Sequence, residues 1–222
     1  MRRLDRLASL GLISASMAHE IKNSMVAIKT FVELLLQKGE DKELNDVVAR
    51  ELKRIDSMVS QMLRFGAASK NEFKPIRAHD ILDVSLRLIE HQLSGKLISV
   101  TRNYKAAKDV VRGDEFQLQQ AFMNLLFNAI EAMGANGVLT VATENLSEDG
   151  REILMIKIQD TGVGISPENL GKLFEPFFTT KKNGTGLGLA ISKKIIHEHL
   201  GGIRPESKLN KGSTFSVSLP LQ

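Results

Sequence analysis

Two long runs of helical periodicity occupy the first 62 residues and restrict the folds open to this chain. Along each run, apolar and small residues recur at steps of three or four, which places them on one face of an α-helix. The break Lys38-Gly39-Glu40-Asp41 separates the runs, so we expect an antiparallel hairpin of two helices. The face consists of Leu4, Leu7, Gly11, Ser14, Ala18, Ile21, Met25, Ile28, Val32 and Leu35, then Leu44, Val48, Leu52, Ile55, Val59 and Met62.

One hairpin cannot cover its own apolar face, because each of its two helices carries a continuous apolar stripe. Two copies can cover one another by pairing into a four-helix bundle, and we therefore expect a homodimer held by this region. The alternative is a helical linker that docks on a second domain of the same chain.

Residues 66–74 are polar and loop-like and end at Pro75, so we divide the chain into domains 1–68 and 69–222. The second domain mixes two periodicities, which predicts an α/β layer with helices on one face of a sheet and an α+β chain as a whole. The expected helices are 79–93, 115–133 and 188–200, and the expected strands are 98–104, 138–144, 152–159 and 213–219.

Composition excludes several classes of protein. The chain has no cysteine, which rules out disulfides, iron–sulfur clusters and thiolate zinc sites. Its net charge of +4 is spread over interspersed acids and bases, without the dense basic run of a nucleic-acid binder. No stretch approaches the roughly 18–20 apolar residues of a membrane span. We expect a cytoplasmic chain, whose full-length protein could still be membrane-anchored.

One glycine-rich segment follows an expected strand, and a second one precedes an expected helix. Asp160-Thr-Gly-Val-Gly-Ile165 places a carboxylate at a strand end, where it can accept a hydrogen bond from an exocyclic amine. Its glycines permit close approach of a flat ligand. Gly184-Thr-Gly-Leu-Gly-Leu189 opens a helix, whose free N–H groups favour an anion. The second segment lacks the endings of both the Walker loop and the dinucleotide fingerprint.

Two further candidate sites are a pair of asparagines and a short segment that begins with a histidine. Asn124 and Asn128 are four residues apart and share a helix face, where amide oxygens suit Mg²⁺ bound to nucleotide phosphates. The alternative is a pair of asparagines bonded to neighbouring loops. His19-Glu-Ile-Lys-Asn23 resembles the zinc motif H-E-x-x-H, but Asn23 replaces the second histidine, so such a zinc site is not expected.

In chain order, these segments resemble the sensor histidine kinases of two-component signalling. The phosphoacceptor motif H-E-[IL]-[RK]-N-P-L is matched by His19 to Met25, and the resemblance covers nearly the whole chain. The other matching elements are the asparagine motif 124–128, the first glycine motif 160–164, the aromatic motif 174–181, the second glycine motif 184–188 and Gly212-Ser-Thr-Phe215. Segment 179–184 is similar to the compact ATP lid of the nitrogen-regulatory type.

The resemblance implies a dimeric phosphoacceptor bundle followed by an ATP-binding sandwich of the GHKL (Bergerat) type. ATP and Mg²⁺ are the implied cofactors, and the implied partners are a response-regulator receiver domain and an upstream sensor domain or subunit outside this chain. His19 would receive the phosphoryl group, Glu20 would act on its proton, and Asn23 would orient water for dephosphorylation of the regulator. Phe174, Phe177 and Phe178 would anchor the lid.

The same resemblance implies a nucleotide site. Asp160 would bind the adenine amine, Asn128 would be the Mg²⁺ ligand, and Asn124 would lie near the phosphates as part of the catalytic set. The remaining nucleotide contacts would come from Gly162, Gly164, Lys181, Gly184, Thr185, Gly186, Leu187, Gly188 and Thr214.

The chain departs from the family at a few positions. Ser24 stands where the family has proline, which predicts a straighter helix beside His19. Pro205 predicts a short or edge strand. His79, His91, His197 and His199 match no family site.

Two other classes remain open. One is a nucleotide-binding scaffold without kinase output, although both His19 and Asn128 are present. The other is an ATP-driven clamp of the gyrase or Hsp90 type, which would be expected to carry a catalytic glutamate where Asn124 stands.

Overall fold

The computed structural model describes residues 73–148, 150–181 and 184–222, together with Val26, Ile28, Thr30 and Val32. The backbone divides into two compact units, residues 1–69 and 70–222. The four described residues of the first unit are helical. The remainder of the expected hairpin, including the position of Ser24, lies outside the described residues, so the bundle and the dimer stay predictions.

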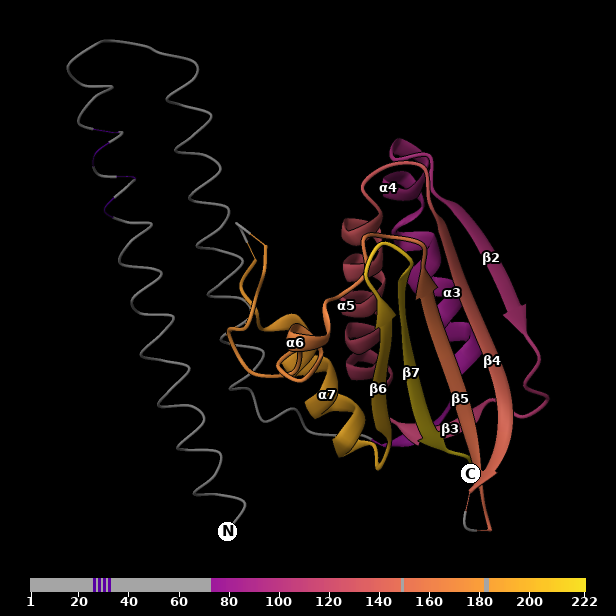
Figure 1. Ribbon diagram of the computed structural model, residues 1–222. Coiled ribbons are helices and arrows are strands. Elements are labelled where there is room, and N and C mark those ends of the chain that lie inside the picture. The colour runs from indigo at the N-terminus through magenta and orange to yellow at the C-terminus, as the bar shows by residue number, and fades with distance from the viewer. Residues whose placement is uncertain are drawn as a thin grey trace, which may run out of the picture. The chain divides into compact units, whose positions relative to one another are not determined.

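The second unit is a mixed five-stranded sheet with helices on one face, as the sequence predicts (Figure 1). The strand order is β2-β4-β5-β7-β6, in which β2 is parallel to β4 and the other pairs are antiparallel. A separate antiparallel pair joins β1 to β3. The strands are β1 Lys74–Arg77, β2 Ser99–Tyr104, β3 Val110–Gly113, β4 Val138–Glu148, β5 Arg151–Asp160, β6 Gly202–Lys208 and β7 Gly212–Pro220. The helices are α3 Ala78–Leu88, α4 Glu90–Gly95, α5 Glu115–Met133, α6 Pro167–Leu170 and α7 Gly188–Glu198.

The core lies between this sheet and α5. Strand alternation sends Ile156 and Ile158 of β5 toward the helices, where both are buried, while Lys157 between them is exposed. Helix α5 packs on β5 and contributes Phe122 and Leu125, which are fully buried. Among the described helices, none combines the length and apolarity needed to cross a bilayer.

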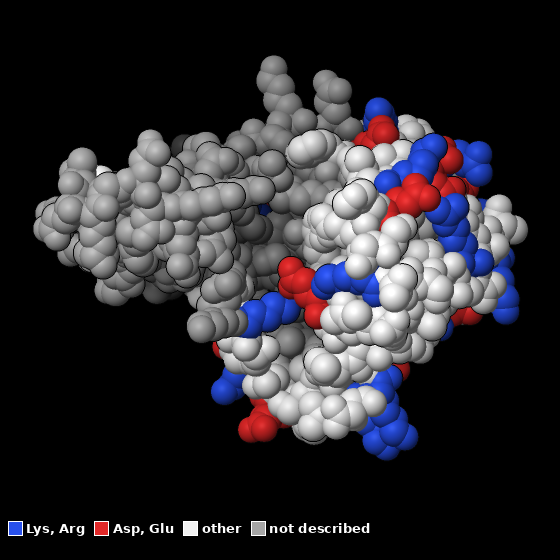
Figure 2. All heavy atoms as spheres, turned by 90° about the horizontal axis from the view of Figure 1, so that it is seen from above, with Lys and Arg blue, Asp and Glu red and all other residues white. Residues whose placement is uncertain are grey.

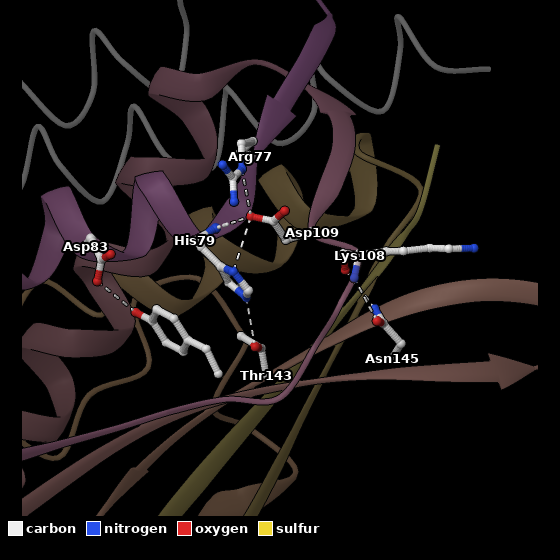
Figure 3. Close-up of polar contacts among 8 residues, drawn as sticks. Arg77, His79, Asp83, Lys108, Asp109, Thr143 and Asn145 are labelled. Atoms are coloured by element: carbon white, nitrogen blue, oxygen red, sulfur yellow. Dashed lines mark hydrogen bonds and ion pairs between the residues drawn. The ribbon is translucent and has the colours of Figure 1, made fainter.

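The start of α3 is fixed by a buried carboxylate from the β2–β3 connection (Figure 3). Asp109 Oδ2 accepts from the His79 backbone N–H at 3.3 Å and from Arg77 Nε at 3.4 Å, and it lies 3.3 Å from His79 Nδ1. The other ring nitrogen of His79 lies 2.9 Å from Thr143 Oγ1 on β4. The Asp109 side chain therefore satisfies a backbone donor in the first turn of α3, and the His79 side chain connects that helix to the sheet.

A tyrosine extends this polar contact on the same side of the sheet. The ring of His79 stacks on Tyr104 with centroids 4.5 Å apart, and Tyr104 donates to Asp83 Oδ1 at 3.2 Å. Burial and the neighbouring Asp83 carboxylate raise the pKa of Tyr104 well above its usual value, so the phenol stays a donor. Near the other end of the same connection, Asn145 bonds both backbone groups of Lys108, at 3.0 and 2.7 Å.

A hydrogen bond joins the N-terminal end of α5 to the C-terminal end of α7. His199, just beyond α7, accepts the backbone N–H of Asp114 at 3.0 Å through Nε2. Its Nδ1 lies 2.8 Å from the Ile195 carbonyl, which makes Nδ1 the protonated nitrogen. A side chain on Gly113 would overlap the imidazole ring. Burial lowers the pKa of His199, so this neutral tautomer is part of the fold.

The structure departs from the expected elements at a few places. The helix predicted over 79–93 is interrupted at Ile89, whose ψ of 2° leaves helical geometry, and so forms α3 and α4. Strands β1 and β3 had no sequence signal, because each has four residues and alternates over too short a distance. Strand β6, which contains Pro205, lies at the sheet edge as predicted.

His199 makes stability depend on pH. Because its pKa is lower in the fold than the ordinary value of about 6.5, the unfolded chain binds more protons, and stability falls as pH drops below that value. His199→Gln keeps an acceptor for the Asp114 amide but cannot be protonated. Urea denaturation at pH 7.5 and 5.5 should show a smaller loss for this variant than for the wild type. The exposed His91→Gln is the control, and an equal loss in wild type and His199→Gln contradicts the assignment.

Candidate functional site

The predicted site residues of the second unit converge along one helix, α5. Asn124 Nδ2 donates to the Gly188 carbonyl, at the start of α7, at 3.1 Å. Two turns further on, the Ala132 carbonyl accepts the Val163 N–H, which follows β5, at 3.1 Å. The two glycine segments of the sequence therefore meet the same helix at two points. Eight residues separate these points, or about 12 Å along the helix axis.

Asp160 supplies a buried carboxylate at the end of β5, with 2% of its surface exposed. Its Oδ1 accepts the Gly162 N–H at 2.8 Å. Burial raises the pKa of Asp160, and the backbone N–H groups of Gly162 and Ser213 oppose that rise. A buried carboxylate bonded to neutral donors is suited to a further neutral donor, such as an amine of a flat heterocycle.

The glycines after Asp160 pack against other parts of the chain. A side chain on Gly162 would overlap the Ala132 backbone, and one on Gly164 would overlap the Lys208 carbonyl. Gly164 also has φ +69°, a conformation that favours glycine. Close approach of a flat ligand is the role predicted for these glycines, and in the structure they also permit close approach of α5 and the β6–β7 hairpin to the chain beside Asp160.

The chain on either side of the expected lid, segment 179–184, meets through a similar backbone approach. Gly186, at φ +66°, lies against Phe177, and a side chain there would overlap the Phe177 backbone. The Phe177 N–H donates to the Gly186 carbonyl at 3.0 Å, while Phe177 itself has φ +68°. Phe174 lies under the Lys193 ammonium, 5.1 Å from the ring centroid. These contacts fix the two ends of the lid to one another and to α7.

The N-terminus of α7 offers backbone donors. Its N-cap residue is Leu187, and no described side chain caps this end. The N–H groups of the first turn have no partner within the helix, so they can receive an anion together with the helix dipole. Asn124 and Ser192 both donate to the Gly188 carbonyl, at 3.1 Å each, which fixes this turn beside α5.

Asn128 and Lys181 meet between α5 and the lid. The ammonium of Lys181 lies 2.9 Å from Asn128 Oδ1 and also forms an ion pair with Glu131. A cation thus already lies at the amide oxygen that the sequence assigns to Mg²⁺, so this oxygen fits a metal. Sequence reasoning missed Glu131, because an acid on a helix surface carries no distinctive signal.

The structure brings most, but not all, of the predicted nucleotide set together. In the register of β5 and β7, Asp160 lies opposite Ser213, whereas Thr214 lies opposite Gln159 and alternates to the other face of the sheet. The structure therefore places Ser213, and not Thr214, beside the buried carboxylate. Gly184 packs against Thr179, and Leu187 is buried. His19, Glu20 and Asn23 lie outside the described residues.

The donor set agrees with a hard cation bound through phosphates. In the described part of the chain, no cluster of three or more His, Asp or Glu side chains could hold a metal by itself. The single amide oxygen of Asn128 agrees with Mg²⁺, which keeps several waters and takes few protein ligands beside substrate phosphates. On the face drawn in Figure 2, acidic and basic side chains of the described residues lie intermingled.

Comparison with known proteins gives two family matches. Residues 113–222 match the family described as histidine kinase-, DNA gyrase B- and HSP90-like ATPase, and residues 9–70 match the His Kinase A (phospho-acceptor) domain. The sensor histidine kinase ZraS of Salmonella typhi is 33% identical over 225 residues, covering 100% of this chain and 48% of that protein. Sporulation kinase C of Bacillus subtilis (strain 168) is 33% identical over 223 residues, covering 100% and 51%. The chain spans about half the length of these relatives.

Solved structures extend the similarity to the fold. A nucleotide-free form of the catalytic domain of histidine kinase ThkA has a TM-score of 0.61 and 32% identity, over 67% of this chain and 95% of that one. Histidine kinase ThkA in complex with response regulator protein TrrA has a TM-score of 0.82 and 28% identity, over 99% and 64%. The expected α+β class with a GHKL-type unit is confirmed. With both family models matched in order and a kinase catalytic domain covered almost completely, this chain belongs to the sensor histidine kinases of two-component signalling.

Proposed function

We propose that this chain is the catalytic core of a histidine protein kinase, which transfers the γ-phosphoryl group of ATP to His19 and then to a response-regulator aspartate. One observation carries the proposal: the segment that follows the buried Asp160 carboxylate and the N-terminus of α7 at Gly188 both bond to α5. These two bonds lie eight residues apart on α5, about 12 Å along its axis, a spacing that suits adenine at one end and polyphosphate at the other.

Each group of the second unit has a defined role in this proposal. The Asp160 carboxylate accepts the adenine amine, and the first-turn N–H groups of α7 receive phosphate oxygens. Asn128 Oδ1 would hold Mg²⁺, which would supply charge neutralisation of the polyphosphate. Lys181 contacts the phosphates once it has left Asn128. Asn124 fixes Gly188 beside the phosphates and so belongs to the catalytic set as a positioning group.

The first unit supplies the nucleophile. A neutral nitrogen of His19 attacks the γ-phosphorus in line, and the bond from that phosphorus to the bridging oxygen of ADP breaks. Glu20 accepts the proton of the other ring nitrogen, so that the product is a phosphoramidate. Asn23, one turn beyond His19 on the same helix face, orients water for dephosphorylating the regulator. We assign this unit to residues 1–68 as a homodimer, and the catalytic unit to residues 69–222, both cytoplasmic.

Two comparisons support the partner assignment. Residues 9–70 match a phospho-acceptor domain. A similar kinase, ThkA, has been solved with the response regulator TrrA. We therefore propose a receiver domain as the acceptor and an upstream sensor as the source of the signal.

Nucleotide binding should stabilise the chain in a metal-dependent way. A ligand that binds the folded state alone adds about 2.7 kcal/mol at a concentration of 100 times its Kd. Mg-ADP should therefore raise the melting temperature of the wild type, and Asn128→Ala should lose most of the part that requires Mg²⁺. Differential scanning fluorimetry with and without EDTA measures both. An unchanged melting temperature at millimolar Mg-ADP would count against the proposed function.

Asp160→Asn should separate stability from binding. The raised pKa means that the charged carboxylate lowers stability once pH exceeds the folded pKa, whereas the amide keeps an oxygen for Gly162. The variant should thus be more stable than the wild type at pH 7, with a smaller difference at pH 4. It should also bind adenine nucleotide more weakly. Urea denaturation and calorimetric titration check the two effects, and a variant that binds as tightly as the wild type contradicts the adenine role.

The kinase output itself is tested by labelling. Wild-type chain incubated with γ-labelled ATP and Mg²⁺ should acquire a label that acid removes and alkali preserves, as a phosphoramidate does. His19→Ala should bind nucleotide normally and acquire no label. A wild type that binds Mg-ADP but never becomes labelled would favour a nucleotide-binding scaffold, and a label that persists in His19→Ala would place the acceptor elsewhere.

A further inference from the structure

The lid and α5 meet through a three-group contact that the proposed reaction does not use. The Lys181 ammonium lies 2.9 Å from Asn128 Oδ1 and pairs with the Glu131 carboxylate. Asn128 and Glu131 are three residues apart on α5 and share a face of that helix. The lid lysine therefore binds two side chains of one helix turn at the same time.

This contact competes with a metal at Asn128, because both would place positive charge on one amide oxygen. Mg²⁺ binds its oxygen ligands at about 2.0–2.1 Å and requires near-octahedral geometry. An ammonium already within hydrogen-bond distance of the same amide oxygen would lie against the metal and its waters, with like charge. Lys181 and Mg²⁺ therefore compete for Asn128 Oδ1, and a metal bound there disfavours the Lys181 contact.

Glu131 adds to the contact that holds Lys181 at Asn128. Its carboxylate neutralises Lys181 and holds the ammonium toward Asn128. Both side chains are about half exposed, at 43% for Lys181 and 54% for Glu131. Ion pairs with this exposure are weak and easily exchanged. A polyphosphate carries more charge than one carboxylate, so it can take Lys181 from Glu131 while Mg²⁺ takes Asn128.

The lid is built to make this exchange local. Its base is fixed by the Phe177–Gly186 contact, so the two ends of the lid need not move. Near its tip, the Lys181 N–H donates to Thr179 Oγ1 at 3.1 Å, and the Gly184 N–H donates to the Lys181 carbonyl at 3.2 Å. These bonds lie within the lid itself, whereas the Lys181 side chain reaches α5.

We propose that Glu131 is a positioning residue that latches the lid in the nucleotide-free state, by holding Lys181 over the Asn128 oxygen until a metal-bound nucleotide displaces it. The latch rests on the proposed function for the identity of the displacing ligand, but not for the existence of the contact. It implies that part of the binding free energy of Mg-nucleotide is spent on breaking the Lys181–Glu131 pair.

Hydrogen–deuterium exchange tests the latch without nucleotide. Glu131→Gln keeps the shape of the side chain and removes its charge. Glu168→Gln on α6, also exposed, is the matched control for the loss of one negative charge. Peptides spanning residues 176–187 should exchange faster in Glu131→Gln than in the wild type, and at the wild-type rate in Glu168→Gln. With saturating Mg-ADP all three chains should exchange alike. Equal exchange in all three nucleotide-free chains overturns the proposal.

Affinity gives the second readout. Because an exposed ion pair contributes little, Glu131→Gln should bind Mg-ADP roughly two- to fivefold more tightly than the wild type, with Glu168→Gln unchanged. Calorimetric titration measures this. Unchanged or weaker binding in Glu131→Gln would mean that Glu131 does not oppose the bound state, and it overturns the latch. A wild type that fails to bind Mg-ADP instead overturns the proposed function, and the exchange comparison still decides whether the latch exists.

Discussion

The packing of α5 against the sheet is the constraint on which the site depends. One side of this helix is core: Leu118, Phe122 and Leu125 are fully buried. The adjoining side carries Asn124, Asn128 and Glu131 at steps of four and three, so the polar groups are held by the same backbone that the core immobilises. Polar groups placed on a packed helix are positioned more accurately than groups on loops. Bonds from α5 to Gly188 and Val163 then set both glycine segments relative to it.

The site contains one firmly held charged group, Asp160, and one weakly held charged group, Lys181. Asp160 is buried, with a pKa raised by burial, and a charge in that position lowers the stability of the free protein. Lys181, in contrast, is half exposed and pairs with groups it can leave. A ligand that spans both sides gains a fixed hydrogen-bond partner at one end and a movable cation at the other. The buried Asp160 charge thus lowers the stability of the free protein at a position where ligand binding needs a carboxylate, which is a common trade-off between stability and function.

The sequence predicted the elements whose boundaries have chemical causes. Helix α5 has the predicted bounds, because Asp114 caps it by accepting the Gln117 N–H at 3.1 Å and Gly134 ends it at φ +65°. The break at Ile89 had no such cause in the local sequence. Ser213 and Thr214 show another limit: a shift of one residue reverses the face on which a side chain lies, and register depends on the partner strand. The role proposed for Glu131 depends on its contact with Lys181, which lies 50 residues away in the sequence.

The glycines have a packing role that the sequence did not predict. Gly212 has φ +91°, and a side chain there would overlap the Asp160 carbonyl, as one on Gly164 would overlap the Lys208 carbonyl. These two contacts lie at the end of β6 and at the start of β7, and they bring the β6–β7 hairpin close to the chain that follows Asp160. Gly186 does the same between the lid and Phe177. A larger residue at any of these three glycine positions would overlap the backbone of the protein itself and displace it, whether or not a ligand is bound. The glycine spacing in this sequence therefore permits close packing of the chain segments beside Asp160 and Phe177, and the proposed nucleotide site takes its shape from that packing.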